Sequence, residues 1–243
     1  MTLATPIRTE RTLTAALAAT PTPPANAEEA DRAAAAAMHS EFAKPADDAA
    51  IERTVAAMRD KGYVVHVVDD AAAAKERIVS LVPEGAEVNQ GASETLDALG
   101  VTDAIEHSGK FDAVRPRTRS MDRSTPEGIR AMRKLGAVPD YFLVSAQALV
   151  EDGTLVIASN TGSQLAPVAF GAGEVIFAIG SQKIVPDLET AMTRIEEHSL
   201  VLEHSRMHKL WGVNSAINKI LIIRKEFRPG RFTVVLIKEP VGA

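Results

Sequence analysis

The sequence predicts an α/β protein, a Rossmann-like and mostly parallel sheet flanked by helices, with an antiparallel hairpin at its C-terminus. Short apolar runs alternate with segments of helical character along most of the chain, which is the pattern of such folds. Residues 153–185 read in order as strand, polar loop, helix, turn and strand, and this order is typical of a βαβ unit. Two final apolar runs, 220–225 and 233–237, flank the turn sequence Arg228-Pro229-Gly230-Arg231, so we expect them to pair as a hairpin.

The start of the chain differs in composition from the rest. Residues 1–25 are rich in Thr, Ala and Pro, and we expect a flexible N-terminal arm followed by a single α/β domain over residues 26–243. Two arginines, a short apolar run and the sequence Ala25-Asn26-Ala27 together resemble a secretion signal. Because Glu10 interrupts the basic part and the apolar run is rich in Ala and Thr, we favour an arm or a short docking helix.

Capping residues, prolines and glycines mark the expected ends of the elements. Asn26 and Ser93 are suited to cap helices, Pro126 fits the first position of a helix, and Gly62 and Gly136 can end helices. The expected helices span residues 26–42, 47–61, 71–82, 93–99, 125–136 and 187–197. The expected strands, besides the hairpin, span residues 63–68, 87–89, 141–144, 155–158 and 175–179. Residues 199–218 fit either one broken helix or two short ones.

Composition excludes several classes of function. Of the 243 residues, 46% are hydrophobic and 24% are charged, as in ordinary globular proteins. The formal net charge of −5 argues against nucleic-acid binding, which needs a basic face for phosphate contacts. No run approaches the ~18–20 apolar residues of a membrane span, so we expect a cytoplasmic protein with no membrane partner. The chain has no cysteine, and therefore it can neither ligate an iron–sulfur cluster by itself nor use a thiolate nucleophile.

Two polar loops are the first candidates for a binding site. Residues 159–164 follow an apolar run and contain small polar side chains around Gly162, whose lack of a Cβ allows close approach of a ligand. Residues 90–95 stand in the same relation to an earlier strand, and the two loops would face one crevice. The alternative for each loop is a plain helix cap. The candidate ligand-binding residues in the two loops are Gly91, Ser93, Glu94, Thr95, Asn160, Thr161, Gly162, Ser163 and Gln164.

A third segment ends a strand at the same predicted edge. Gln182 offers an amide there, and Lys183 offers a positive charge that would neutralise an anionic ligand. A solvated surface lysine is the alternative for Lys183.

Other groups of residues favour structural roles or stay open. Four arginines between residues 115 and 123 could bind a carboxylate, but a solvated loop paired with carboxylates is favoured. His204 and His208 are spaced for zinc, yet no third ligand is evident, so no metal is predicted. Glu94, Glu151 and Glu174 are nominal nucleophiles for a CoA-transferase reaction, and no catalytic pair stands out, so the catalytic residues stay unknown.

Several of these segments resemble the LUD domain of the lactate-utilisation proteins. The matching segments are Val88 to Leu96, Glu151 to Val156, Thr161-Gly162, Phe170-Gly171, Val175-Ile176, Gly180, Lys183 to Val185, Asp187 to Glu189, Arg194-Ile195 and the two closing apolar runs. By the order and spacing of these motifs the resemblance covers roughly residues 50–240. It implies the NagB/RpiA/CoA-transferase-like fold. Some relatives carry cysteines near the position of residues 200–215, where this chain has none.

The resemblance implies an accessory protein or non-redox subunit of bacterial lactate utilisation, in which L-lactate is oxidised to pyruvate with separate iron–sulfur partner proteins. The chain itself would bind a small anionic metabolite at the sheet edge without a cofactor, and a homodimer is left open. An alternative is a stand-alone enzyme of the same fold that acts on a phosphorylated or CoA-linked metabolite, so enzymatic activity also stays open. A third alternative is a ligand-sensing or purely structural relative that has lost its chemistry.

Overall fold

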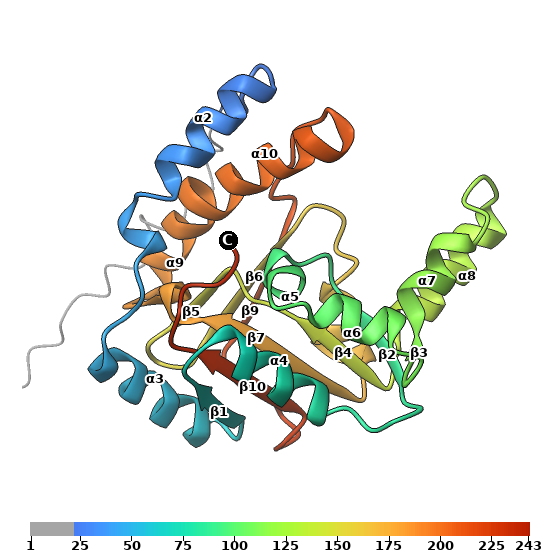
Figure 1. The fold of residues 1–243 in the computed structure, drawn as a ribbon, viewed down its shortest axis with the longest axis horizontal. Helices are drawn as coiled ribbons and strands as arrows, with labels where there is room; N and C mark the ends of the chain where they lie inside the picture. The colour runs from blue at the N-terminus through green and yellow to red at the C-terminus, as the bar shows by residue number, and fades with distance from the viewer. Residues whose placement is uncertain (1–21) are drawn as a thin grey trace, which may run out of the picture.

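Two β-sheets form the framework of the protein, seen in a computed structural model that describes residues 22–243. The larger sheet holds six parallel strands in the order β1 (Val64–Val68), β10 (Phe232–Ile237), β7 (Glu174–Gly180), β4 (Tyr141–Val144), β2 (Glu87–Gln90) and β3 (Asp112–Ala113). The smaller, mixed sheet has the order β8 (Ile184–Val185), β5 (Ala148–Val150), β6 (Leu155–Ser159) and β9 (Lys219–Ile223). The α/β fold class is therefore confirmed (Figure 1).

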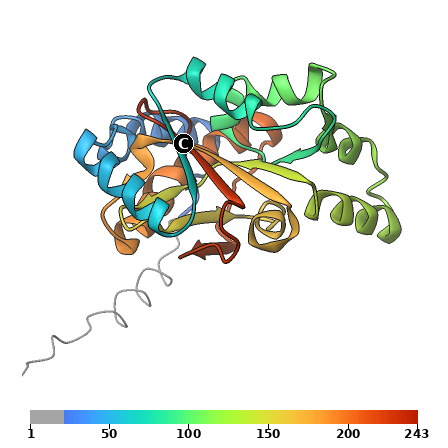
Figure 2. The ribbon, with the colours of Figure 1, turned by 90° about the horizontal axis from the view of Figure 1, so that it is seen from below.

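Helices lie on both sides of this framework. The α-helices are α2 (Ala27–Ala37), α3 (Asp48–Asp60), α4 (Ala71–Ser80), α5 (Glu94–Ala98), α6 (Val101–His107), α7 (Val114–Ser120), α8 (Pro126–Ala137), α9 (Leu188–Arg194) and α10 (Leu200–Trp211). Short 3-10 turns cover Glu41–Ala43 and Ser181–Lys183, and π-helical turns cover Pro167–Gly171 and Ile195–Ser199. In both ribbon views α7 and α8 project from one end of the molecule (Figures 1 and 2).

The predicted helix caps form where the sequence indicates them. The side chain of Asn26 accepts a hydrogen bond from the backbone N–H of Glu29, and Ser93 Oγ accepts one from Leu96. Thr125 caps α8, with Pro126 at the first position. The ambiguous region 199–218 is α10, which continues α9 through a π-helical turn and ends at Gly212, a residue with a φ of 68°.

Both faces of the large sheet are buried, as a parallel sheet requires. Along β7, Val175, Phe177 and Ile179 point into one core, whereas Ile176 and Ala178 point into the other, because side chains alternate along a strand. Helices α4, α5 and α6 cover the second of these faces.

The small sheet covers the first face of the large sheet. Leu155 and Ile157 of β6 share a buried cluster with Phe142 and Phe177 of the large sheet, and α3 adds Met58 to the same cluster. On its outer face the small sheet packs against Met192 and Ile195 at the end of α9. The molecule therefore has four layers. Helices α4, α5 and α6 form the first layer and the parallel sheet forms the second. The mixed sheet, together with α3, forms the third layer, and α9 forms the fourth.

The predicted C-terminal hairpin is wrong. Strand β9 pairs antiparallel with β6 in the small sheet, whereas β10 lies parallel between β1 and β7 in the large one. The turn at Pro229-Gly230 forms, with a hydrogen bond from the Arg231 N–H to the Arg228 carbonyl, but it leads from one sheet to the other. The physical reason is burial: β10 has apolar side chains on both faces and belongs inside a sheet, whereas β9 keeps Ile222 exposed.

The βαβ interpretation of residues 153–185 is also wrong. Strand β6 lies in the small sheet and β7 in the large one. The segment between them holds a short helical turn that ends at Gly171. The connection, residues 160–173, is long enough for a crossover, but β6 pairs antiparallel with β5 and β9 in the small sheet, so the connection leads from one sheet to the other.

The expected arm over residues 1–25 lies almost entirely outside the described residues. Of the described part of the chain, Pro24 packs close to the end of α10, where its carbonyl accepts a hydrogen bond from the Asn214 side chain. Between residues 22 and 243 no helix has the length and apolar character needed to span a membrane.

Arg231 links the large sheet to the segment that follows the polar loop of residues 159–164. Its buried guanidinium donates to the carbonyls of Pro167, Val168 and Ala172 and pairs with Glu226 at 2.7 Å. We predict that Arg231→Ala lowers the free energy of unfolding by about 3–5 kcal/mol, because it removes the cation that pairs with a largely buried carboxylate, together with three buried hydrogen bonds to carbonyls. Urea denaturation measures this change.

Arg228→Ala is the matched control for Arg231→Ala. Arg228 pairs with Glu174 at 2.9 Å on the exposed surface, and exposed pairs contribute no more than about 1 kcal/mol. Equal losses in the two variants would contradict the assigned role of Arg231.

Candidate functional site

The order of the strands creates a crevice at one edge of the large sheet. From β2 the chain runs outward to β3, then returns through β4 toward β7 and β10. The connections therefore leave β2 and β4 in opposite directions, and ligands bind in α/β sheets outside the carboxyl ends of such strands. A cavity of about 290 Å³ lies at this point.

Several parts of the chain line this cavity, including residues 215–217 before β9, the π-helical turn before α10 and the last residue, Ala243. The loops that follow β2, β4 and β7 supply three further parts, the loop after β6 supplies a fourth, and α10 forms the opposite wall. The structure thus brings together the two polar loops that the sequence singles out, although they follow strands of different sheets. The predicted site residues that line the cavity are Gly91, Ser93, Glu94, Thr95, Asn160, Thr161, Ser163, Gln164 and Lys183.

Gly162 and Gln182 lie outside the lining. Gly162 has a φ of +88°, and its N–H donates to Ser159 Oγ at 2.8 Å, so this amide is not free for a ligand. The amide of Gln182 donates to the carbonyls of Val241 and Gly242 at 3.0 and 2.9 Å. Both residues therefore shape the backbone around the cavity.

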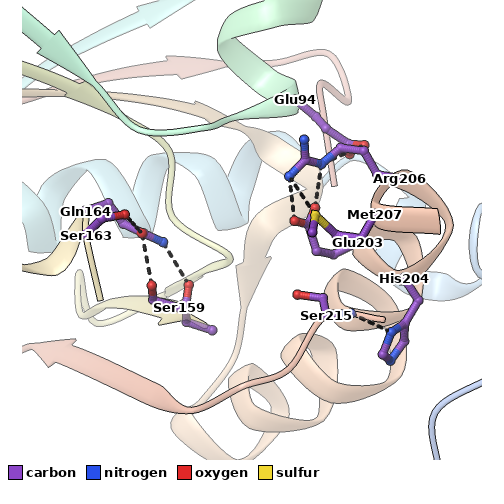
Figure 3. Close-up of polar contacts among 10 residues, drawn as sticks. Glu94, Ser159, Ser163, Gln164, Glu203, His204, Arg206, Met207 and Ser215 are labelled. Atoms are coloured by element: carbon purple, nitrogen blue, oxygen red, sulfur yellow. Dashed lines mark hydrogen bonds and ion pairs between the residues drawn. The ribbon is translucent and has the colours of Figure 1, made fainter. Parts of the chain in front are cut away.

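The loop after β6 is held by its own side chains. Ser159 Oγ donates to Gln164 Oε1 at 3.0 Å, and Gln164 Nε2 donates to the carbonyl of Ala158 at 3.2 Å. Thr161 and Ser163 join their hydroxyls at 3.2 Å. Figure 3 shows Ser159, Ser163 and Gln164 on one side and Glu203, Arg206 and Met207 of α10 on the other, and all six residues line the cavity. The loop is therefore a pre-formed wall of hydroxyl and amide groups.

Lys183 is buried at the edge where three strands end. Its side chain is 2% exposed, so a solvated surface lysine is ruled out. Lys183 Nζ lies 3.0 Å from Thr95 Oγ1 and 3.1 Å from Ser145 Oγ. Burial, with a smaller contribution from the charge of Arg194, holds the pKa of Lys183 well below its ordinary value of 10.5, whereas Glu94 acts in the opposite direction.

Arg194 places a second buried cation behind Lys183. The guanidinium donates to the carbonyls of Gln147, Gln182 and Phe42 and to Ser199 Oγ. Within residues 22–243 no carboxylate pairs with Arg194 or with Lys183. Desolvation lowers the pKa of Arg194 to about 10, so the group stays charged at neutral pH and is not neutralised by a protein carboxylate.

The wall opposite the loops carries charges of both signs. Arg206 forms a bidentate pair with Glu203, at 2.6 and 2.5 Å, and its Nε lies 4.0 Å from Glu94 Oε1 (Figure 3). Burial, and then the charge of Glu203, raises the pKa of Glu94. Glu203 and Arg206 of α10 and Glu94 at the start of α5 therefore place two carboxylates and one guanidinium where this wall meets the loop after β2.

Three residues that line this cavity escaped the sequence analysis, Ser145, Glu203 and Arg206, and so did Arg194, which is buried behind Lys183. Arg194 had a detectable signal, because it lies three residues after Ala191 on the apolar face of the predicted helix 187–197. Glu203 and Arg206 have the spacing of a helical ion pair. Ser145 had no signal, since its role depends on the neighbouring strands.

The remaining candidates have structural roles. Arg115 and Arg119 pair with Glu106, and Arg117 pairs with Glu87 and Asp112, as predicted, but these arginines lie on helix α7 and not in a loop. His204 Nδ1 accepts a hydrogen bond from the Ser215 N–H, and His208 Nε2 contacts the Asn214 side chain, so both fix the chain after α10. In the described part of the chain no three His, Asp or Glu side chains are grouped to hold a metal ion.

Only one of the three nominal glutamate nucleophiles reaches the cavity. Glu94 lines it, whereas Glu151 pairs with Arg53 and Glu174 pairs with Arg228 elsewhere.

The buried amine makes stability depend on pH. Because the folded-state pKa of Lys183 lies below the ordinary 10.5, the unfolded chain binds more protons between these two values, and stability rises with pH across that window. We predict that the native protein gains free energy of unfolding relative to Lys183→Met as the pH increases toward 10.5.

Urea denaturation over a pH series measures this difference, with Lys219→Met, an exposed lysine beside the same cavity, as the matched control. Parallel stability profiles for the native protein and Lys183→Met would show that the lysine keeps an ordinary pKa.

Comparisons with known proteins agree with this architecture. A crystal structure of a DUF162 family protein from Deinococcus radiodurans is similar with a TM-score of 0.50 at 13% identity, covering 79% of this chain and 99% of that one. At this identity the likeness concerns the fold alone. No curated protein matches the chain. A sequence model of the LUD domain matches residues 51–237, well over half of the chain. The chain belongs to the LUD-domain family.

Proposed function

We propose that the protein binds a small carboxylate metabolite in the cavity, and that it serves bacterial lactate utilisation as an accessory protein or non-redox subunit. The single observation that carries the ligand class is Arg194, a buried guanidinium beside the cavity that no carboxylate neutralises within the described residues. The family supports the lactate role, because the LUD domain is similar to that of lactate-utilisation proteins.

Electrostatics favour an anion in this cavity. A charge in the protein interior is screened much less than one in water, and a buried charge without a partner is costly. An anion that enters the cavity offsets part of this cost, because it approaches Arg194 and any protonated Lys183 together. Arg206 on the opposite wall keeps Glu94 and Glu203 from repelling it.

The size of the cavity favours a small metabolite. Its volume of about 290 Å³ stands at the lower end of the range of about 300–1,000 Å³ that small-molecule sites occupy. The hydroxyls of Thr95 and Ser145 and the polar wall of residues 159–164 can bind carboxylate or hydroxyl groups.

The sequence supports a role in which this chain carries no iron–sulfur cluster of its own. With no cysteine in the chain, electrons from lactate oxidation would pass through separate iron–sulfur proteins, and this chain would bind substrate or product beside them.

A stand-alone enzyme is the second candidate function, and Glu94 is the observation that favours it. A glutamate that lines the cavity beside Lys183, and whose pKa is raised by burial, could attack an acyl group or transfer a proton. This candidate would take a phosphorylated or CoA-linked metabolite.

Calorimetry with a ligand panel separates the two candidates. The panel contains L-lactate, pyruvate, inorganic phosphate, ribose 5-phosphate and acetyl-CoA. We expect the two carboxylates to bind. Binding of the phosphate or CoA compounds alone would support the enzyme. If none of the compounds binds, the proposed binding function is overturned.

Arg206→Met tests the role of the wall. We predict that it weakens binding of L-lactate by about tenfold, or ~1.4 kcal/mol, because Glu94 and Glu203 then face the anion without a neighbouring guanidinium. Arg228→Met, which breaks an exposed ion pair at the opposite edge of the sheet, is the control and leaves the affinity unchanged. Equal affinities for L-lactate in all three proteins would show that Arg206 does not contribute to ligand binding.

Deletion of the gene tests the pathway. Slow growth on L-lactate, restored by the native gene, and retention of iron–sulfur partner proteins in a pull-down are the expected results. Normal growth without a retained partner would contradict the lactate role and leave the ligand measurements standing.

A further inference from the structure

We infer that Lys183 captures its ligand covalently: Nζ forms a reversible imine with the carbonyl carbon of a small 2-oxo acid. The inference rests on the proposed function, since it places the oxo acid that corresponds to a 2-hydroxy acid such as lactate in the same cavity. It adds a chemical step to what would otherwise be simple anion binding.

The surroundings of Nζ suit a nucleophilic amine. Lys183 lines the cavity although its side chain is almost fully buried. Its two hydrogen-bond partners are the hydroxyls of Thr95 and Ser145, at 3.0 and 3.1 Å. A hydroxyl can donate as well as accept, so both partners remain satisfied whether the amine is protonated or neutral. A carboxylate partner would instead hold the proton on the nitrogen.

Charge near the amine acts in the same direction. Desolvation and the neighbouring Arg194 disfavour the ammonium form and lower its pKa, and a desolvated lysine next to another cation is a known way to obtain an amine nucleophile. The same guanidinium attracts the carboxylate of a 2-oxo acid. One buried charge therefore serves both binding of the acid and activation of the amine.

The chemistry balances without a further reactant. The lone pair of neutral Nζ forms a bond to the carbonyl carbon, and the carbonyl π electrons move to oxygen, which takes a proton from the nitrogen to give a carbinolamine. The hydroxyl then takes a proton from protonated Glu94, and the C–O bond breaks so that water leaves as the nitrogen lone pair forms the C=N bond. The resulting iminium returns its N–H proton to the Glu94 carboxylate, which gives the imine and restores the acid. The net change is amine plus ketone to imine plus water, with no oxidation or reduction.

Proton transfer in these steps falls to groups that line the cavity. Ser145 and Thr95 contact Nζ directly, and they can pass a proton between nitrogen and oxygen. Glu94 lines the cavity and has a raised pKa, so it can deliver a proton to the departing water.

Reductive trapping tests the inference. The full-length protein is treated with sodium borohydride in the presence of pyruvate, and intact mass and peptide mapping follow the adduct. We expect one adduct, on the peptide that contains Lys183. L-lactate is the matched ligand control, because it carries the carboxylate but no carbonyl and must give no adduct.

Variants identify the nitrogen that forms the imine and the residue that assists its proton transfer. Lys183→Met should abolish trapping, whereas Lys219→Met, at an exposed lysine whose Nζ lies 3.4 Å from the carbonyl of Asn160, should leave it unchanged. If Lys183→Met does not fold, peptide mapping of the native protein still identifies the modified lysine. Ser145→Ala should keep the adduct but slow its formation by about tenfold or more, at the lower end of general acid–base effects.

The outcomes separate this inference from the proposed function. Calorimetric binding of pyruvate and L-lactate without an adduct at Lys183 overturns the imine and leaves small-anion binding intact. Adducts spread over exposed lysines and unaffected by Lys183→Met also overturn it. If L-lactate does not bind but pyruvate forms an adduct on Lys183, noncovalent carboxylate binding is removed and the imine is supported. If neither carboxylate binds and no adduct forms, the proposed function and the imine are both overturned.

Discussion

Burial of both faces of the parallel sheet is the constraint on which the structure depends. Helices α4, α5 and α6 cover one face, and the small mixed sheet covers the other through Leu155 and Ile157. Because β6 packs on the large sheet, the loop that follows it reaches the carboxyl edge where β2, β4 and β7 end. The cavity thus exists because two sheets share one core, and the π-helical turn held by Arg231 fixes the exit of that loop.

Two buried basic side chains at the cavity are unfavourable for the stability of the fold. Lys183 and Arg194 are buried basic groups without carboxylate partners in the described part of the chain, and a positive charge on either costs several kcal/mol unless something offsets it. Arg194 is partly compensated by four neutral acceptors, whereas Lys183 has two hydroxyls. A perturbed amine in a cavity is typical of functional sites, and this is the physical link between the fold, anion binding and covalent capture.

The site could be predicted in part from the sequence, for identifiable reasons. Small polar residues directly after apolar runs mark strand ends, and this pattern located residues 91–95, 159–164 and Lys183. The pattern could not separate residues that line a cavity from residues that shape the backbone beside it, as Gly162 and Gln182 do. Ser145, Glu203 and Arg206 enter the site only because a neighbouring strand and a distant helix come close to the loops.

By itself the sequence determined local structure: the helix caps at Asn26, Ser93 and Thr125, the alternation of strands and helices, the α/β class and the absence of thiol chemistry. Tertiary structure alone decided which sheet each strand joins. An apolar run such as 233–237 pairs equally well as a hairpin or inside a parallel sheet, and only the burial of both its faces selects the second. The same holds for Lys183: its spacing places it at a strand end, but the layers packed above it remove the water and turn a surface cation into a buried amine.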